Sequence, residues 1–178
     1  IGWVEFWDSR AIEGTIKQVI VSRDGTHWSV SFQIEQEMPD PVHPATAAVG
    51  IDLGIATFAA FSDGMLHPPL NAYRKAEKKK ARMQRKLAGM VKYSQNWKKQ
   101  QRRIAKLDSR IAHCRHDFLH KLSTETSKNH AVIVVEDLQV KHMSKSSRGT
   151  AEEPGRQVAQ KSGLNKAILD QGWGMFRG

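Results

Sequence analysis

Residues 49–64 read VGIDLGIATFAAFSDG and place one carboxylate, Asp52, in the middle of an apolar run. Apolar residues at positions 49, 51 and 53 alternate with Gly50, Asp52 and Gly54, which predicts a β-strand whose apolar face points away from Asp52. We expect one long strand, the turn SDG and a shorter second strand in MLHPP. The glycines would let a phosphate, a metal ion or another backbone approach closely. Because an isolated buried carboxylate is costly, we favour a functional role for Asp52 over a carboxylate held by local backbone N–H groups.

A second acid ends another expected strand. Residues 130–138, HAVIVVEDL, form an apolar run that finishes in Glu136 and Asp137. Such a run is typical of a strand buried on both faces, as in a parallel sheet, and ligand groups of open α/β sheets lie at strand ends of this kind. Taken alone, Glu136 could equally mark a strand that frays into a polar loop, with Asp137 on the opposite face.

Together the two acids predict a metal site in an α/β fold. Mg²⁺ prefers oxygen ligands and is often held by one or two carboxylates with substrate phosphates, and a pair of such ions can activate water for attack on a phosphodiester. We therefore predict that Asp52 and Glu136 are catalytic residues and ligands of Mg²⁺ or Mn²⁺. Their strands would pair in parallel in a mixed sheet, joined by a right-handed helical crossover.

The positive charge of the chain is concentrated in one segment. Residues 73–128 hold 18 Lys and Arg against 4 Asp and Glu, whereas the rest of the chain holds 10 basic and 14 acidic residues. A local excess of this size suits a polyanion such as DNA or RNA, whereas an ordinary solvated helical face mixes both signs. The residues that we predict to bind nucleic acid are Arg74, Lys78, Lys79, Arg82, Arg85, Lys86, Lys98, Lys99, Arg102, Arg103, Lys106 and Arg110.

The same segment has a helical pattern. We expect a helical hairpin over residues 71–128, with a break around residues 91–96 and a second helix capped by Ser94 or Asn96. Steps of three and four residues predict one apolar stripe on that helix, made of Ile104, Leu107, Ile111, Cys114, Phe118 and Leu122. His116 and His120 lie four residues apart, a spacing that zinc can use. No third ligand is in evidence, so we favour phosphate contact or plain solvation for them.

The flanking regions predict smaller elements. Residues 15–35 read as a β-hairpin with Asp-Gly at its turn, and Trp28 would join Trp3 and Phe6 in a core. The Pro-rich residues 37–46 indicate a linker, so we place a boundary near residue 45, with one module over residues 1–45 and another over 46–178. We expect a polar loop over residues 141–163. A helix would begin at residue 164, and its Trp173 and Phe176 would pack on the sheet.

Composition excludes several classes. No apolar run of about 18 residues is present, which argues against a membrane span or a membrane partner. The only cysteine, Cys114, excludes an internal disulfide and a cysteine-built zinc site, and it fits a reducing cytoplasm. The start at Ile1 and the abrupt end lead us to expect a fragment of a longer protein.

Several stretches resemble one family in order and spacing over nearly the whole chain. They are the N-terminal hairpin segment, VGIDLGIATFAAFSDG, the basic helical segment, VIVVEDLQVKHM and ILDQGWGMFR. Together they are similar to the TnpB-type, or OrfB, transposases of bacterial and archaeal insertion sequences, which are related to type V CRISPR effector nucleases.

The resemblance implies a RuvC-like nuclease domain with the RNase H-like fold, which cleaves DNA guided by a bound RNA and uses Mg²⁺-type ions. The first catalytic carboxylate of the family matches Asp52 and the second matches Glu136. Residues 1–45 look like the end of a β-barrel, wedge-type module that contacts nucleic acid. The resemblance also implies that the protein is prokaryotic, lies in the cytoplasm and associates with the nucleoid.

The chain also departs from the family pattern. In the family a zinc ribbon and a third catalytic Asp follow the last helix, and neither has a match here; Asp170 does not fit the motif of the third acid. We therefore expect the printed chain to be poorly active. Two other hypotheses are an actin-like ATPase, whose further phosphate and adenosine motifs are absent, and a non-catalytic nucleic-acid-binding module, which the charge would suit equally well.

Overall fold

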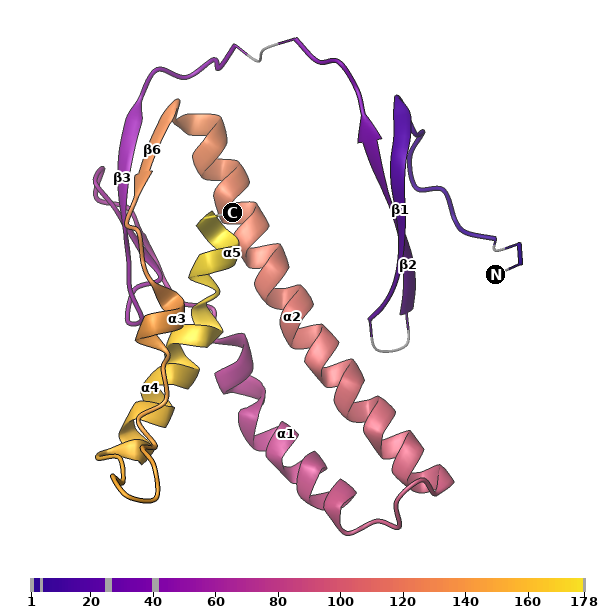
Figure 1. Cartoon of the computed structure of the whole chain (residues 1–178). Helices are drawn as coiled ribbons and strands as arrows, with labels where there is room; N and C mark the ends of the chain where they lie inside the picture. The colour runs from indigo at the N-terminus through magenta and orange to yellow at the C-terminus, as the bar shows by residue number, and fades with distance from the viewer. Residues whose placement is uncertain (1, 4, 25–26, 40–41, 178) are drawn as a thin grey trace.

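The computed structural model describes residues 2–3, 5–24, 27–39 and 42–177. Figure 1 shows how its elements are arranged along the chain. They are β1 (Thr15–Asp24), β2 (His27–Glu35), β3 (Ala48–Leu53), β4 (Ala59–Phe61), β5 (Leu66–His67), α1 (Ala72–Ala88), α2 (Gln95–Asn129), β6 (Val132–Val135), α3 (Val140–Met143), α4 (Val158–Gln171) and α5 (Trp173–Arg177).

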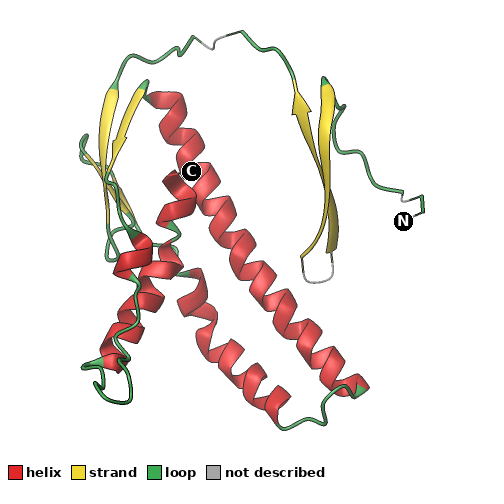
Figure 2. Cartoon of the chain, viewed as in Figure 1, coloured by secondary structure: helices red, strands yellow, loops and turns green. Residues whose placement is uncertain are grey.

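A four-stranded mixed sheet organises the C-terminal part of the chain. Its order is β5-β4-β3-β6, with β3 antiparallel to β4 and parallel to β6. The chain leaves the sheet after β5, runs through α1 and α2 and returns as β6 (Figure 2). The mixed α/β class and the parallel β3–β6 pairing joined by helices are therefore confirmed.

The single long strand expected over residues 47–61 is wrong, because the chain bends at Gly54. The Gly54 N–H donates to the carbonyl of Phe58 at 3.2 Å, and a Cβ built on Gly54 would lie 2.8 Å from the carbonyl oxygen of Thr57. This close approach of two backbone segments requires glycine. The antiparallel partner of β3 is therefore β4, inside the stretch expected to be one strand, and β5 pairs with β4 instead.

One face of the sheet packs against helices. Val49, Ile51 and Leu53 of β3 are buried with Phe58, Ala59 and Phe61, and they meet Leu119 and Leu122 of α2 and Ile168 of α4. Trp173 belongs to this core, and the ring of Phe176 meets that of Phe58 edge to face at 5.4 Å between centroids. The expected packing of Trp173 and Phe176 on the sheet is confirmed.

The expectation that the strand of residues 130–138 is buried on both faces is wrong. In this chain β6 is the last strand of the sheet. Its Val132 and Val134 are 54% and 63% exposed. The apolar run identifies a strand, but the burial of a strand depends on which other elements cover it. None of the described elements covers the face of β6 that carries Val132 and Val134.

The two long helices have nearly the expected bounds. Ser94 caps α2, accepting a hydrogen bond from the Trp97 N–H at 3.2 Å. Ile104, Ile111 and Leu122 are buried along the expected stripe, whereas Cys114 is exposed. Despite its 35 residues, α2 is too polar to cross a membrane, and so is every other described helix.

The N-terminal hairpin forms as expected between β1 and β2, although residues 25–26 of its turn lie outside the described residues. The expected core of aromatic residues is wrong, since Trp3 and Phe6 are exposed and Trp28 is 68% exposed. A two-stranded sheet has no second layer of its own to cover a face. The hairpin contacts α2 through Asp24, whose carboxylate accepts a hydrogen bond from Ser109 at 2.6 Å. The boundary near residue 45 stays a prediction.

The expected loop over residues 141–163 is partly wrong. A short helix, α3, occupies its start, and α4 begins six residues before the expected helix. Tertiary hydrogen bonds join the two, since Lys161 Nζ donates to the carbonyl of Met143 at 2.7 Å and Asn165 Nδ2 to that of Ser144 at 2.8 Å. Polar side chains serve here as helix-to-helix donors, which the polar pattern alone does not distinguish from a loop.

Candidate carboxylate pair and nucleic-acid interface

Asp52 lies on the open face of β3. Its neighbours Ile51 and Leu53 point into the core, and Asp52 itself is exposed. The expected orientation away from the apolar face is confirmed, whereas the premise of a buried carboxylate is wrong. An exposed carboxylate carries no large desolvation cost, so the presence of Asp52 does not by itself demand a metal.

The two predicted acids directly follow the last residue pair of the β3–β6 ladder. In the parallel β3–β6 pair, Gly50 lies opposite Val134 and Ile51 opposite Val135. The next residue on each segment is Asp52 and Glu136. Asp52 still belongs to β3, whereas Glu136 is the first residue after β6, and both side chains are exposed.

Neither carboxylate is engaged by another side chain. Within the described residues, no hydrogen bond or ion pair involves the carboxylate of Asp52 or of Glu136. Asp137 differs, because its carboxylate pairs with the Arg177 guanidinium and accepts a hydrogen bond from Gln139 Nε2 at 3.1 Å. The geometry therefore separates two consecutive acids, one free to take an external ligand and one occupied by a local contact.

The two glycines beside Asp52 have different surroundings. A Cβ on Gly50 would meet the Ser62 side chain at 3.8 Å, an ordinary contact, and the Gly50 N–H donates to Ser62 Oγ at 3.0 Å. Gly54 is required by the bend after β3. The close approach expected at this site is thus made at Gly54 by the chain's own backbone.

All twelve side chains predicted to bind nucleic acid are exposed on α1 and α2. No ion pair in the described part of the chain involves any of them. The cations of the same segment that do form ion pairs are Lys80, Arg115 and Lys121.

The positions of the acidic residues explain why some cations of this segment form ion pairs and the twelve predicted ones do not. Asp108 pairs with Lys80 at 2.6 Å, Asp117 with Lys121 at 2.8 Å, and Glu77 with Lys166 of α4 at 2.7 Å. The hydrogen bond and negative charge of Glu77 raise the pKa of Lys166 above its usual value. These acids neutralise other cations, so the charge of the twelve predicted side chains remains available to a polyanion.

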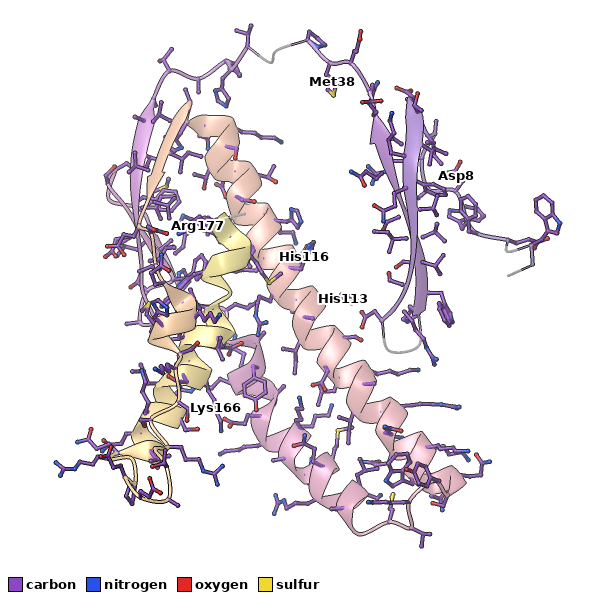
Figure 3. All side chains as sticks on the ribbon, viewed as in Figure 1. Asp8, Met38, His113, His116, Lys166 and Arg177 are labelled. Carbon is purple, nitrogen blue, oxygen red and sulfur yellow. The ribbon has the colours of Figure 1, made fainter. Side chains whose placement is uncertain are left out.

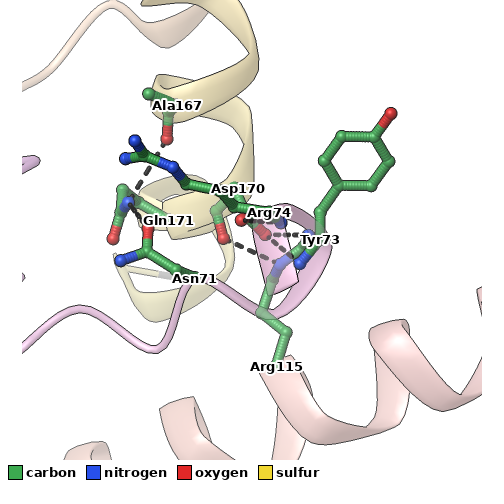
Figure 4. Close-up of polar contacts among 7 residues, drawn as sticks. All are labelled: Asn71, Tyr73, Arg74, Arg115, Ala167, Asp170 and Gln171. Atoms are coloured by element: carbon green, nitrogen blue, oxygen red, sulfur yellow. Dashed lines mark hydrogen bonds and ion pairs between the residues drawn. The ribbon is translucent and has the colours of Figure 1, made fainter. Parts of the chain in front are cut away.

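Sequence reasoning missed the part played by Asp170. Its carboxylate accepts hydrogen bonds from the backbone N–H groups of Tyr73 at 2.9 Å and Arg74 at 3.0 Å, and from Arg115 Nη2 at 3.0 Å (Figure 4). Its side chain is 2% exposed. Asp170 therefore satisfies orphan donors at the start of α1 and joins α1, α2 and α4. The sequence around Asp170 carries no pattern that predicts contacts with residues so far away along the chain.

Two of the three histidines of α2 that lie close together in the sequence contact each other. His116 Nε2 lies 3.2 Å from His120 Nε2, and His113 Nε2 lies 3.0 Å from Asp24 Oδ2 of the hairpin. Figure 3 labels His113 and His116 along α2. Over the described ranges, no three or more His, Cys, Asp or Glu side chains gather as a metal site.

Comparisons with known proteins agree with the resemblance drawn from the sequence. The OrfB_IS605 family, described as "Probable transposase", matches residues 31–147. The chain is 51% identical, over 97% of its length, to a protein of Escherichia coli strain K12 named "Putative RNA-guided DNA endonuclease InsQ". It is 34% identical, over 89% of its length, to a "Putative RNA-guided DNA endonuclease" of Streptomyces pristinaespiralis.

The chain covers 43% of the first relative and 36% of the second, which is less than half the length of either. Both matches include the β3 and β6 segments, because they extend over nearly all of the chain. On the family match and these identities, the chain belongs to the OrfB_IS605 family of TnpB-type transposases.

Proposed function

We propose that this chain is part of a transposon-encoded, RNA-guided DNA endonuclease that depends on Mg²⁺ or Mn²⁺. Asp52 and Glu136 would be two of its metal ligands. The observation that supports the proposal is the parallel β3–β6 pairing, since Asp52 and Glu136 directly follow its last residue pair, Ile51 and Val135. The names of the two relatives support the RNA-guided activity.

The donor set suits a hard cation. Two carboxylates that are both exposed and have no partner among the described side chains offer the oxygen ligands that Mg²⁺ and Mn²⁺ prefer. When bound, such ions activate water and stabilise the leaving oxygen of a phosphodiester. The part of this chain would be to hold the carboxylates in a fixed register while the basic helices keep the phosphate backbone nearby.

The fold supports a RuvC-like, RNase H-like domain over residues 46–178. An antiparallel hairpin followed by a parallel strand on the other side of β3 is a mixed sheet of the kind that the resemblance implies. Residues 1–45 would belong to a wedge-type module that contacts guide RNA and target DNA. We place the intact protein in the prokaryotic cytoplasm, at the nucleoid.

The basic surface would bind the polyanions. The twelve exposed cations of α1 and α2 give a sequence-independent attraction for phosphates. Specificity would come from the guide RNA, as the resemblance implies. The printed chain has no match to the third acid of the family, so we expect it to bind metal with two carboxylates and to cleave poorly by itself.

The test is anomalous diffraction from crystals of the chain soaked in Mn²⁺. We expect a peak between the Asp52 and Glu136 carboxylates that is lost in Asp52→Asn and in Glu136→Gln. The matched control is Asp137→Asn. It removes the same charge one residue after Glu136, from a carboxylate that is already paired with Arg177. The peak should persist in this control.

Two results would contradict the metal proposal: no peak in the unsubstituted chain, or a peak that survives Asp52→Asn. Retained binding of a DNA or RNA oligonucleotide would then favour the alternative, a non-catalytic nucleic-acid-binding module. Loss of both metal and nucleic-acid binding would argue against both hypotheses.

A further inference from the structure

The side chains of His116 and His120 converge in the middle of α2. They lie four residues apart and so share one face of the helix. Their Nε2 atoms are 3.2 Å apart, and their ring centroids 4.2 Å apart at an interplanar angle of 63°. Leu119 between them is buried in the core, which fixes how this part of α2 is turned toward the sheet.

The distance between the two nitrogens matches a chelate. Two imidazole nitrogens bound to one tetrahedral Zn²⁺ at 2.0–2.1 Å are about 3.3–3.4 Å apart, and at the 90° angle of a square-planar Cu²⁺ they are about 2.8 Å apart. The separation of 3.2 Å lies between these values. Rotation of the two rings about their side-chain torsions, which would move their centroids apart, would direct both nitrogens at one ion.

The surroundings leave room for further ligands. Both histidines are exposed and line a cavity of about 630 Å³ between α2, β6 and α5, whose other walls include Ser123, Ile133 and Arg177. Water or another small donor can therefore complete the coordination, as at other metal sites with open positions.

The positive charge close to the two rings is already offset. Arg177, on the wall of the same cavity, is paired with Asp137. Lys121, next to His120 in sequence, is paired with Asp117 at 2.8 Å. Arg115, next to His116, is held by Asp170 at 3.0 Å. Repulsion of an incoming cation is thereby reduced.

We propose that His116 and His120 form a binding site for a borderline-soft divalent cation, namely Zn²⁺, Cu²⁺ or Ni²⁺. Imidazole nitrogen selects these ions over Mg²⁺ and Mn²⁺, which prefer oxygen. The site is independent of the proposed Asp52–Glu136 pair, and the bound ion joins two successive turns of α2. The ion therefore stabilises the folded chain, since it binds there more tightly than to an unfolded segment.

The test is titration of the 178-residue chain with Cu²⁺ and Zn²⁺, followed by calorimetry and, for Cu²⁺, by the nitrogen couplings in its paramagnetic resonance spectrum. We expect two coupled imidazole nitrogens in the unsubstituted chain. His116→Gln and His120→Gln should each leave one nitrogen and weaken binding by roughly tenfold or more, because the second contact is intramolecular. Both side chains are exposed, so these variants should remain folded.

Two controls separate geometry from histidine content. His142→Gln removes an exposed histidine of α3 and should change nothing. The double variant His120→Gln with Lys121→His keeps the number of histidines but moves the second ring off the face shared with His116. This double variant should bind Cu²⁺ and Zn²⁺ as weakly as His120→Gln alone. Zn²⁺ should also raise the melting temperature of the unsubstituted chain and of His142→Gln, but not that of His116→Gln.

The proposal is overturned if His116→Gln and His120→Gln bind Cu²⁺ as tightly as the unsubstituted chain, or if the combined variant restores binding. The 3.2 Å contact would then be a hydrogen bond between the two rings and nothing more. A Mn²⁺ peak at Asp52 and Glu136 would bear only on the endonuclease proposal, so the two proposals can fail separately.

Discussion

Arg115 of α2 contacts Asp170 of α4 twice. Its Nη2 lies 3.0 Å from the carboxylate, and its Nε donates to the Asp170 backbone carbonyl at 3.0 Å. The same carboxylate receives two N–H groups from the first turn of α1. The basic helical hairpin is therefore tied to the C-terminal helices by one buried charge.

Asp170→Ala should strongly destabilise the fold. It leaves the Arg115 guanidinium and two backbone donors without their acceptor, and breaking a buried pair from one side costs about 3–5 kcal/mol. Urea unfolding followed by circular dichroism measures this change in the free energy of unfolding. Asp137→Ala, which breaks an exposed ion pair, is the control and should cost under about 1 kcal/mol. Equal losses in the two variants would contradict the assigned role of Asp170.

The two glycines flanking Asp52 should respond differently to alanine. Gly54→Ala forces a Cβ to within 2.8 Å of the Thr57 carbonyl oxygen, whereas Gly50→Ala meets Ser62 at 3.8 Å. Backbone must move in the first variant, so we expect it to cost about 1–3 kcal/mol, and the second under about 1 kcal/mol. Chemical denaturation of both variants checks this. A reversed order would mean that the bend after β3 does not need glycine.

The unpaired cations of α2 should set the salt dependence of nucleic-acid binding. Replacing Arg102 and Arg103 with Ala removes two exposed charges that no described acid pairs with. If both neutralise phosphates, the slope of log affinity against log salt should fall by roughly 1.4–1.8 in magnitude. Fluorescence anisotropy with a labelled oligonucleotide measures it. Lys121→Ala, whose charge is offset by Asp117, should change the slope less; an equal change would show that pairing does not distinguish the two sets.

The ion pair between Glu77 and Lys166 should give a contribution to stability that depends on alkaline pH. The hydrogen bond and the negative charge of Glu77 raise the pKa of Lys166 in the folded state above the ordinary value of a lysine. A group whose pKa is raised by folding stabilises the folded chain below its unfolded pKa, and this contribution disappears as the pH rises through the folded pKa. The melting temperatures of the unsubstituted chain and Glu77→Gln should therefore differ at pH 8 and converge once the pH has risen through the folded pKa of Lys166. A difference that persists above that pKa would contradict the pairing.

Much of the candidate site was readable from local pattern. Alternation around Asp52 predicted its strand and orientation, and the apolar run before Glu136 predicted a parallel partner. What alternation could not supply was the register between the two strands, since a shift of β6 by two residues leaves every side chain on the same face. The Ile51–Val135 pairing was fixed only when β6 met β3.

The sequence by itself determined the elements whose signals are local: a strand at Asp52, the α1 and α2 spans and the charge excess on the helices. Tertiary structure decided the rest. The bend at Gly54, the exposed edge at β6, the capture of Asp170 by Arg115 and the convergence of His116 with His120 all depend on which segments meet. Periodicity records which face of an element is apolar, whereas these contacts depend on side-chain geometry and on distances across the fold, about which a local pattern carries no information.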